Sequence, residues 1–213
     1  RLEYTGAAVS SNRNIILAGT TGGGTISANG TGPLTLSGTA SGNAAGTKTL
    51  TLNGSNVGDN TFSGAISDGA GGSVLALAKT GGSTWVLSSA TNTYTGGTTV
   101  SGGNLTVASG SSIGAATGNL TVNTGGTLNF NNAAQTIGVL SGTGGTINLT
   151  GNSTIVHALT INDAGNNATF SGSFAGPGMI TKSTGAGSLT LAGSSTHTGG
   201  FTINAGTLKV TND

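Results

Sequence analysis

The sequence has few of the residue types that most often form reactive or charged sites. Its 213 residues include no cysteine, two prolines and only 5% charged side chains. Without cysteine the chain can form neither a disulfide nor a cysteine-based zinc site. Six Lys and Arg residues and a net charge of +1 cannot neutralise a phosphate backbone, so we expect no nucleic-acid partner. No apolar run approaches the ~18 residues of a transmembrane helix, so no membrane-spanning segment is expected.

Glycine and small polar residues dominate instead. The chain has 42 glycines, and Thr, Ser and Asn supply most of the polar content. Disordered chains are usually charged and poor in β-branched residues, whereas this one is almost neutral and rich in Val, Ile, Leu and Thr. These residues suit a pleated, half-buried surface. The composition therefore predicts an ordered, all-β protein with glycine-rich turns.

A long internal repeat runs through the chain. The segment 62–107 aligns with 170–210, and the similarity extends upstream, so the degenerate repeats cover about residues 50–107 and 159–210. A shorter pattern also recurs along the chain, in which aliphatic-x-aliphatic groups follow glycine, as in "GTLNF" and "GTINL". Such alternation places the aliphatic residues on one face of a strand and Thr or Asn on the other.

Many short, evenly spaced strands suit either an antiparallel barrel or sandwich, or a solenoid. The strands here are short, their connections vary in length and long segments recur, which favours the solenoid. We therefore predict one domain over residues 1–213, a right-handed parallel β-helix of about ten coils with roughly 20 residues each. Stacked charges would repel one another between coils, which explains why charged residues are scarce.

The residues of the repeat resemble a known family. Residues 79–107, "KTGGSTWVLSSATNTYTGGTTVSGGNLTV", are similar to the autotransporter-associated β-strand repeat, also called the passenger-associated transport repeat. The matching positions are Lys79, Leu87, 92–100, Leu105 and Val107. Residues 180–210 form a second copy, with His197 where tyrosine is usual. The resemblance implies a β-helical rod that is secreted and displayed on a bacterial surface.

The carboxylates are too scattered to suggest an enzyme. They are Glu3, Asp59, Asp68, Asp163 and Asp213, and no two of them lie close together in the sequence. A β-helix that cleaves polysaccharides needs clustered carboxylates. We therefore predict no catalytic residues, and we expect Asp59 and Asp163 to be solvated in corresponding loops.

The remaining candidates also favour structural roles. His157 and His197 are the only histidines and cannot hold a metal without further ligands, so neither a metal nor a cofactor is expected. Trp85 occupies an aliphatic position of its strand pattern, which indicates packing rather than a sugar-stacking platform. Lys79 and Lys182 begin the two repeat copies, where we expect solvated turns.

Charge is concentrated near the two ends of the chain. A solenoid leaves raw strand edges at both ends, and charges there could either block pairing or direct it. We therefore predict a candidate assembly interface with these members: Arg1, Leu2, Glu3, Tyr4, Arg13, Lys209 and Asp213. A contact between unlike ends does not close on itself, so it would give a head-to-tail homopolymer.

The leading hypothesis is a non-enzymatic, extracellular rod on the bacterial cell surface. It would be structural or adhesive, with copies of itself, surface glycans or other cells as partners and with head-to-tail filaments as one mode of assembly. Two alternatives stay open. One is a β-helix that binds or degrades polysaccharides, and the other is a stalk segment of a larger autotransporter passenger.

Overall fold

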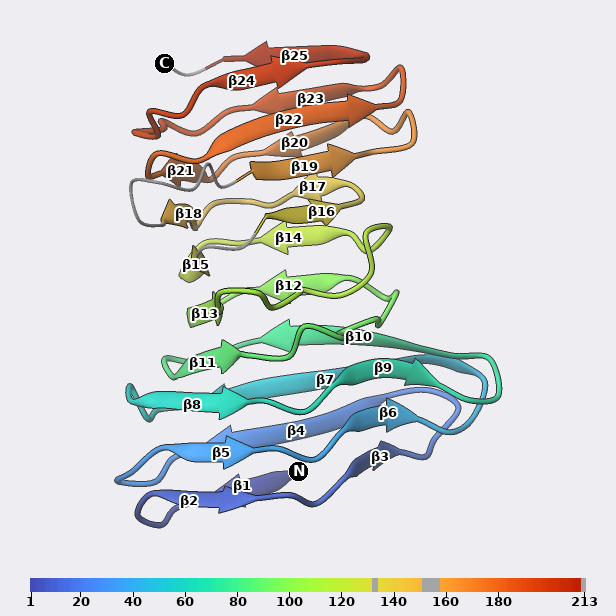
Figure 1. The fold of residues 1–213 in the computed structure, drawn as a ribbon, viewed down its shortest axis with the longest axis vertical. Coiled ribbons are helices and arrows are strands. Elements are labelled where there is room, and N and C mark those ends of the chain that lie inside the picture. The colour runs from blue at the N-terminus through green and yellow to red at the C-terminus, as the bar shows by residue number, and fades with distance from the viewer. Residues whose placement is uncertain (132–133, 151–157, 212–213) are drawn as a thin grey trace.

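The chain forms a rod of stacked β-coils in which the two termini lie at opposite ends (Figure 1). The computed structural model describes residues 1–131, 134–150 and 158–211. Over these residues the secondary structure consists of strands β1 to β25, with no helix. Each pairing between strands is parallel, and each strand of a sheet pairs with the strand one coil earlier or one coil later in the chain. The expected all-β parallel solenoid is therefore confirmed.

The first face of the rod contains two sheets that follow one another. The lower sheet contains β1 (Leu2–Tyr4), β4 (Gly23–Ala28), β7 (Gly46–Gly54), β10 (Ser73–Lys79), β12 (Thr98–Val100), β14 (Leu120–Val122) and β17 (Leu140–Ser141). The upper sheet contains β20 (Ala168–Phe170), β23 (Ser188–Leu191) and β25 (Thr207–Val210). A parallel bridge between Gly142 and Phe170 joins the two, so β25 lies on the same face as β1.

The other two faces complete each coil. The second face is one sheet of β2 (Val9–Ser11), β5 (Leu34–Leu36), β8 (Asp59–Phe62), β11 (Thr84–Leu87), β13 (Gly103–Val107), β15 (Gly126–Asn131), β18 (Thr146–Thr150) and β21 (Ser173–Ala175). The third face has a lower sheet of β3 (Ile15–Leu17), β6 (Ala40–Gly42) and β9 (Ile66–Gly69). Its upper sheet contains β16 (Gln135–Ile137), β19 (Ala158–Asn162), β22 (Met179–Thr184) and β24 (Phe201–Ile203).

The core consists of ladders of apolar side chains that run along the rod. In one ladder of the second face, Trp85 lies opposite Leu105, and Leu105 lies opposite Leu128. All three side chains are fully buried, so the packing role expected for Trp85 is confirmed. Burial alternates with half-exposure along the strands, as in β10, because successive side chains point to opposite faces of a sheet.

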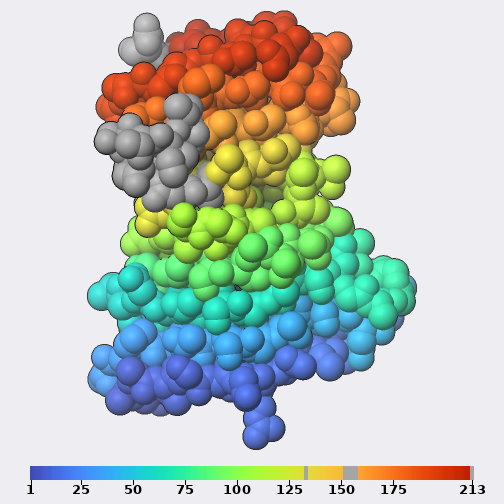
Figure 2. Space-filling view, in the orientation of Figure 1, coloured from blue at the N-terminus to red at the C-terminus, as the bar shows by residue number. Residues whose placement is uncertain are grey.

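The first three coils are longer than most of the later ones, although residues 142–170 form another long coil. Side-chain hydrogen bonds to the neighbouring coil span 26 residues near Leu34 but 20 residues near Thr121. Figure 2 shows the result, because the N-terminal part of the rod is broader than the part above it. The longest sheet has eight strands, and the solenoid has about eight turns against the ten predicted. The prediction assumed the shorter coil throughout.

A glycine at the start of β12 shows why the corners tolerate little else. Gly97 has φ of 82°, in the left-handed region, and a Cβ there would lie 2.6 Å from the carbonyl oxygen of Asn119 in the next coil. Only glycine combines that conformation with so close an approach of two backbones. Gly200 holds the same place in the second repeat copy with φ of 77°, but a Cβ added there would have no described atom within 4 Å.

Candidate functional site

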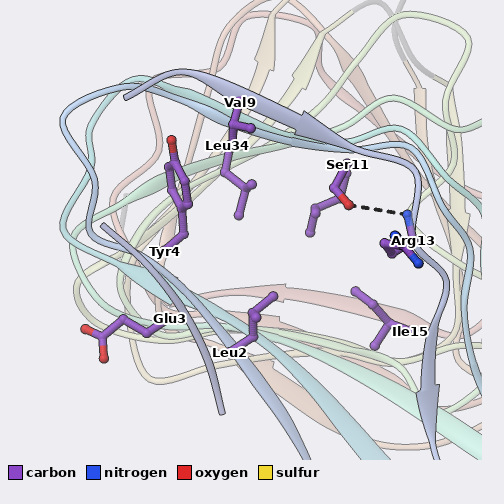
Figure 3. A pocket seen from close by; sticks show the side chains of 9 residues that line it. Leu2, Glu3, Tyr4, Val9, Ser11, Arg13, Ile15 and Leu34 are labelled. Carbon is purple, nitrogen blue, oxygen red and sulfur yellow. Dashed lines mark hydrogen bonds between the residues drawn. The ribbon is translucent and has the colours of Figure 1, made fainter. Parts of the chain in front are cut away.

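The N-terminal end of the described rod forms a mouth in which core positions are exposed. Leu2 and Val9 are 54% and 44% exposed, although both lie opposite core residues of the second coil, Ile26 and Leu34. They surround a hollow of about 390 Å³ that is lined mainly by apolar side chains. Figure 3 shows Leu2, Leu34 and Ile15 pointing toward its centre, whereas Glu3 points away. The mouth therefore presents core positions without a covering coil.

Charged and polar groups lie at the edge of this mouth. Arg1 forms an exposed ion pair with Glu3, with 3.1 Å between a guanidinium nitrogen and Oε1. Asn29 in the next coil donates to the same carboxylate oxygen from Nδ2 at 2.7 Å. Arg13 is exposed at the far side, where its backbone N–H donates to Ser11 Oγ at 3.4 Å. Arg13 lies between β2 and β3, and one residue from each strand, Ser11 and Ile15, also lines the hollow.

The C-terminal end is also open. Ile203 and Val210 are 51% and 53% exposed, and Phe201 is exposed as well, although Phe201 and Val210 lie opposite the core residues Ile180 and Leu191. Here too, inward-facing positions of the last coil lack a covering layer. Both ends of the described rod therefore expose apolar core positions and unpaired strand edges.

His197 stabilises the last coil as an aromatic residue. Its ring lies between those of Phe174 and Phe201, at centroid distances of 5.9 and 4.6 Å. Burial lowers the pKa of His197, and the nearby backbone of Gly200 opposes that effect. Neither ring nitrogen has a hydrogen bond of normal geometry within the described part of the chain. The ring therefore packs against aromatic neighbours in the last coil. His157 lies outside the described residues.

The predicted assembly residues divide between the two ends. Arg1, Leu2, Glu3, Tyr4 and Arg13 lie together at the N-terminal mouth. Lys209 lies on β25 at the opposite end and is exposed. Asp213 lies outside the described residues. The structure thus brings the first five together and separates them from Lys209 by the length of the rod (Figure 1).

The interpretation of Lys79 and Lys182 as solvated turn residues is wrong. Both side chains are fully buried. Lys79 Nζ donates to the carbonyl oxygens of Thr80, Gly81 and Gly102 at 2.8, 3.0 and 2.8 Å, so it joins its own corner to that of the next coil. Burial lowers the pKa of Lys79 from its ordinary 10.5 to about 8.

Lys48 and Lys182 also make contacts from buried positions at the corners, and Lys182 does so with the carboxylate of Asp163. Lys48 is buried, and its Nζ donates to the carbonyl oxygens of Ala44 and Gly46. Lys182 Nζ lies 2.8 Å from Asp163 Oδ2, with 1% and 3% of the two side chains exposed. The expectation that Asp163 is solvated is therefore wrong as well. A buried lysine needs such partners because an unpaired ammonium is costly to desolvate. Asp59, by contrast, is exposed as expected.

Sequence reasoning also missed three buried amides that connect the coils. The Oδ1 atom of Asn60 accepts from the Leu34 N–H, that of Asn92 accepts from the Ile66 N–H, and Gln135 Oε1 accepts from the Ile113 N–H, all at 2.9 to 3.0 Å. Each amide nitrogen donates to backbone carbonyls. An amide can satisfy donors and acceptors on two coils at once. The sequence did offer one signal for these amides, because each is a polar residue at a position that faces inward.

The described interior offers no reactive cluster. Within the described ranges, no group of three or more His, Asp or Glu side chains lies close enough to hold a metal ion. The same residues include no helix long and apolar enough to span a bilayer. The buried lysines and amides are occupied by backbone and carboxylate partners. The groups that remain available for binding are those of the outer faces and of the two open ends.

These observations define a class of protein: a parallel β-solenoid with buried lysine corner contacts. Residues 77–107 and 184–210 match the passenger-associated-transport-repeat family. The chain belongs to this family of autotransporter repeats through those two copies.

One relative supports this assignment over a larger part of the chain. It is the adhesin BmaC autotransporter of Brucella suis biovar 1 (strain 1330), which is 42% identical over 176 residues. The aligned region is 82% of this chain but only 4% of that protein. No solved structure matches the chain.

Proposed function

We propose that this protein is a non-enzymatic, adhesive β-solenoid displayed on the outer surface of a bacterium. The similarity to an autotransporter adhesin supports an extracellular, adhesive role. The structure supports a binding rather than a reacting surface, because the buried lysines and carboxylate serve the corners and the outer strand positions are mostly Thr, Ser and Asn. This surface can form many weak, uncharged hydrogen bonds.

We also propose that copies assemble head-to-tail into a filament. The observation that carries this step is the exposure of core positions at both ends, Leu2 and Val9 at one and Ile203 and Val210 at the other. Exposed apolar patches and free strand edges of this kind are typical of surfaces that pair with another chain. Stacking would bury both and extend the three faces without a change of fold.

Electron microscopy and sedimentation of the purified 213-residue chain test the filament. We expect fibres one solenoid wide whose mean length rises with protein concentration. Discrete rods of one length at every concentration would exclude this assembly. For adhesion, beads coated with the chain should bind cultured cells more than beads coated with the urea-unfolded chain. Equal binding by the two kinds of bead would count against an adhesive solenoid.

Polysaccharide binding is a second candidate function. It is favoured by an outward-facing rank on the second face, in which each residue lies opposite the next. The rank consists of Asp59, Thr84, Asn104, Thr127, Thr146 and Ser173. Such a rank repeats hydroxyl and amide groups at the spacing of strands, about 4.8 Å. A glycan array separates this function from adhesion to proteins, and a reducing-sugar assay on the same glycans separates binding from degradation.

A role as one segment of a longer passenger is a third candidate. It is favoured by the small share, 4%, of the adhesin that the alignment covers. In that case the open ends would contact further coils of the same polypeptide. The purified chain would then remain as single rods in the sedimentation experiment, because the coils that cover its ends would be absent.

A further inference from the structure

The two open ends match each other in one register, and this inference rests on the proposed head-to-tail assembly. We propose that β25 of one copy pairs in parallel with β1 of the next, with Leu208 opposite Leu2, Lys209 opposite Glu3 and Val210 opposite Tyr4. The partner of each end is therefore a second copy of this chain. The pairing would add one continuous rung to the first face of the rod.

The order of faces at the two ends is compatible with this junction. β25 lies on the face that starts with β1, because the Gly142–Phe170 bridge joins the two sheets of that face. The last strand of the third face is β24, and the first is β3. On the second face, the Thr196 N–H donates to the Phe174 carbonyl of β21, and the Thr198 N–H donates to the Gly176 carbonyl just after β21. Residues 195–198 would therefore lie against β2 of the next copy. All three faces thus continue by one level together.

The free backbone edge of β1 is set by its contact with the second coil. In a parallel ladder the N–H and C=O of one residue point to the same side, and successive residues alternate. The Tyr4 carbonyl accepts from the Asn29 N–H at 2.8 Å, so Tyr4 turns its backbone groups toward the second coil. The backbone N–H and C=O of Glu3 therefore point to the open edge.

On the free edge of β25, the backbone groups that point outward are placed to pair with those of Glu3. The N–H groups of Thr207 and Thr211 donate to the previous coil at 3.1 and 3.0 Å. By the same alternation, the backbone groups of Leu208 and Val210 point outward along the rod. In the proposed register the Glu3 N–H donates to the Leu208 carbonyl, and the Glu3 carbonyl accepts from the Val210 N–H.

The inward side chains would complete the core across the junction. Leu208 and Val210 lie opposite Leu189 and Leu191 of the core on one side and would lie over Leu2 and Tyr4 on the other. Their side chains, with those of Phe201 on β24, would cover the hollow of about 390 Å³ at the N-terminal mouth. Covering these positions removes apolar surface from water, which favours association.

Charge selects this register from its neighbours. Lys209 and Glu3 are both exposed and outward-facing, and among the described residues Lys209 takes part in no ion pair. The proposed register places the two side chains on adjacent strands, where opposite charges attract. A shift by two residues would place Lys209 opposite Thr5 or opposite Arg1, which loses the attraction or replaces it with repulsion. A shift by one residue would turn the apolar side chains out of the core.

A charge-exchange experiment tests the pair. Glu3→Lys alone and Lys209→Glu alone should each raise the critical concentration for polymerisation about fivefold, by replacing attraction with repulsion. An equimolar mixture of the two variants should polymerise as the wild type does, because every junction then pairs opposite charges. Asp59→Lys changes the net charge as much as Glu3→Lys does, but at a side face, and should polymerise normally.

Cysteine cross-linking tests the register itself, since the chain has no native cysteine. Adjacent strands lie about 4.8 Å apart, within the range that a disulfide spans. Glu3→Cys with Lys209→Cys should therefore give a ladder of covalent multimers after mild oxidation. Glu3→Cys with Thr190→Cys should not, because Thr190 lies one coil deeper, at roughly twice that spacing.

The outcomes separate this register from the assembly on which it rests. If the wild-type chain forms no polymer, head-to-tail assembly fails and the register fails with it. If polymers form, but the mixture of charge variants does not recover and the variant with Glu3→Cys and Lys209→Cys does not cross-link, the filament stands and the register is overturned. Circular dichroism of each variant before assembly establishes that a loss of polymer does not come from unfolding.

Discussion

Lys182 and Asp163 form a buried ion pair inside the rod, with 2.8 Å between Nζ and Oδ2. Lys182 Nζ also donates to the carbonyl oxygens of Thr184 and Gly185 at 3.4 and 3.3 Å. Asp163 Oδ1 accepts from the Gly165 N–H at 3.1 Å, and the Asp163 carbonyl accepts from Asn166 Nδ2 at 2.6 Å. The pair therefore fixes two glycine-rich corners of neighbouring coils with respect to each other.

Removing one partner of this pair should destabilise the protein strongly. Lys182→Met leaves the Asp163 carboxylate buried without a cation, and we expect the free energy of unfolding to fall by about 3–5 kcal/mol. Urea denaturation followed by circular dichroism measures the change. The double variant Lys182→Met with Asp163→Leu should be more stable than Lys182→Met alone. If the double variant is the less stable of the two, the carboxylate is not the source of the loss.

Lys79 should make stability rise with pH in the alkaline range. Burial lowers its pKa from 10.5 to about 8, so between these values the unfolded chain binds more protons than the folded chain. The free energy of unfolding should therefore increase from pH 8 toward pH 10. Urea denaturation at pH 7.5, 8.5 and 9.5 measures it, and Lys79→Met should flatten the slope.

The upper limit of that pH range is set by Tyr94. Burial raises the pKa of Tyr94 above its ordinary 10, so its ionisation in the unfolded chain removes stability above about pH 10. The effects of Lys79 and Tyr94 have opposite signs and separate windows. A wild-type slope between pH 7.5 and 9.5 that is zero or negative would contradict the burial of a charged Lys79.

The hydroxyl of Tyr94 should contribute a measurable hydrogen bond. Its oxygen lies 2.7 Å from Thr98 Oγ1, and Thr98 Oγ1 in turn donates to the Ile113 carbonyl at 3.2 Å. Tyr94→Phe removes one bond of this chain and should lower the free energy of unfolding by about 1 kcal/mol. A double-mutant cycle with Thr98→Val measures the coupling, which should be close to zero if the two hydroxyls do not interact.

The two repeat copies supply a matched pair of glycine substitutions. Gly97→Ala should destabilise the chain more than Gly200→Ala, although both residues have positive φ. The added Cβ at position 97 meets the Asn119 backbone, whereas position 200 faces no described atom within 4 Å. Thermal unfolding of the two variants compares them. Equal losses would mean that the conformation alone, and not the contact between coils, determines the cost.

The sequence predicted the repeated architecture but not the chemistry of the corners. Alternation in segments such as "GTLNF" specifies which side chains face inward, and Trp85 and Leu105 follow that pattern. Lys79 and Lys182 occupy inward positions of the same alternation, in phase with Leu77 and Ile180. The local sequence nevertheless predicts that they are solvated, because a lysine near a glycine turn normally indicates solvent. Their burial depends on carbonyl oxygens that converge only when two coils stack, and no local pattern encodes that convergence.

The end faces show the same limit. The charged residues near both termini led to the prediction of an assembly surface, and the structure places five of the predicted residues at one mouth. The proposed complementarity of the two ends depends on which backbone groups point outward, which follows from the strand phase and not from composition.

The stacking of coils also determines how the rod would respond to force. Every described strand pairs only with the coil before it and the coil after it. A chain pulled by its two ends would therefore peel from an end, one coil at a time, because no single contact ties distant coils together. The load at any moment would act on a single rung. The extension released at each step would be larger for the first three coils than for most later ones, because those coils contain more residues.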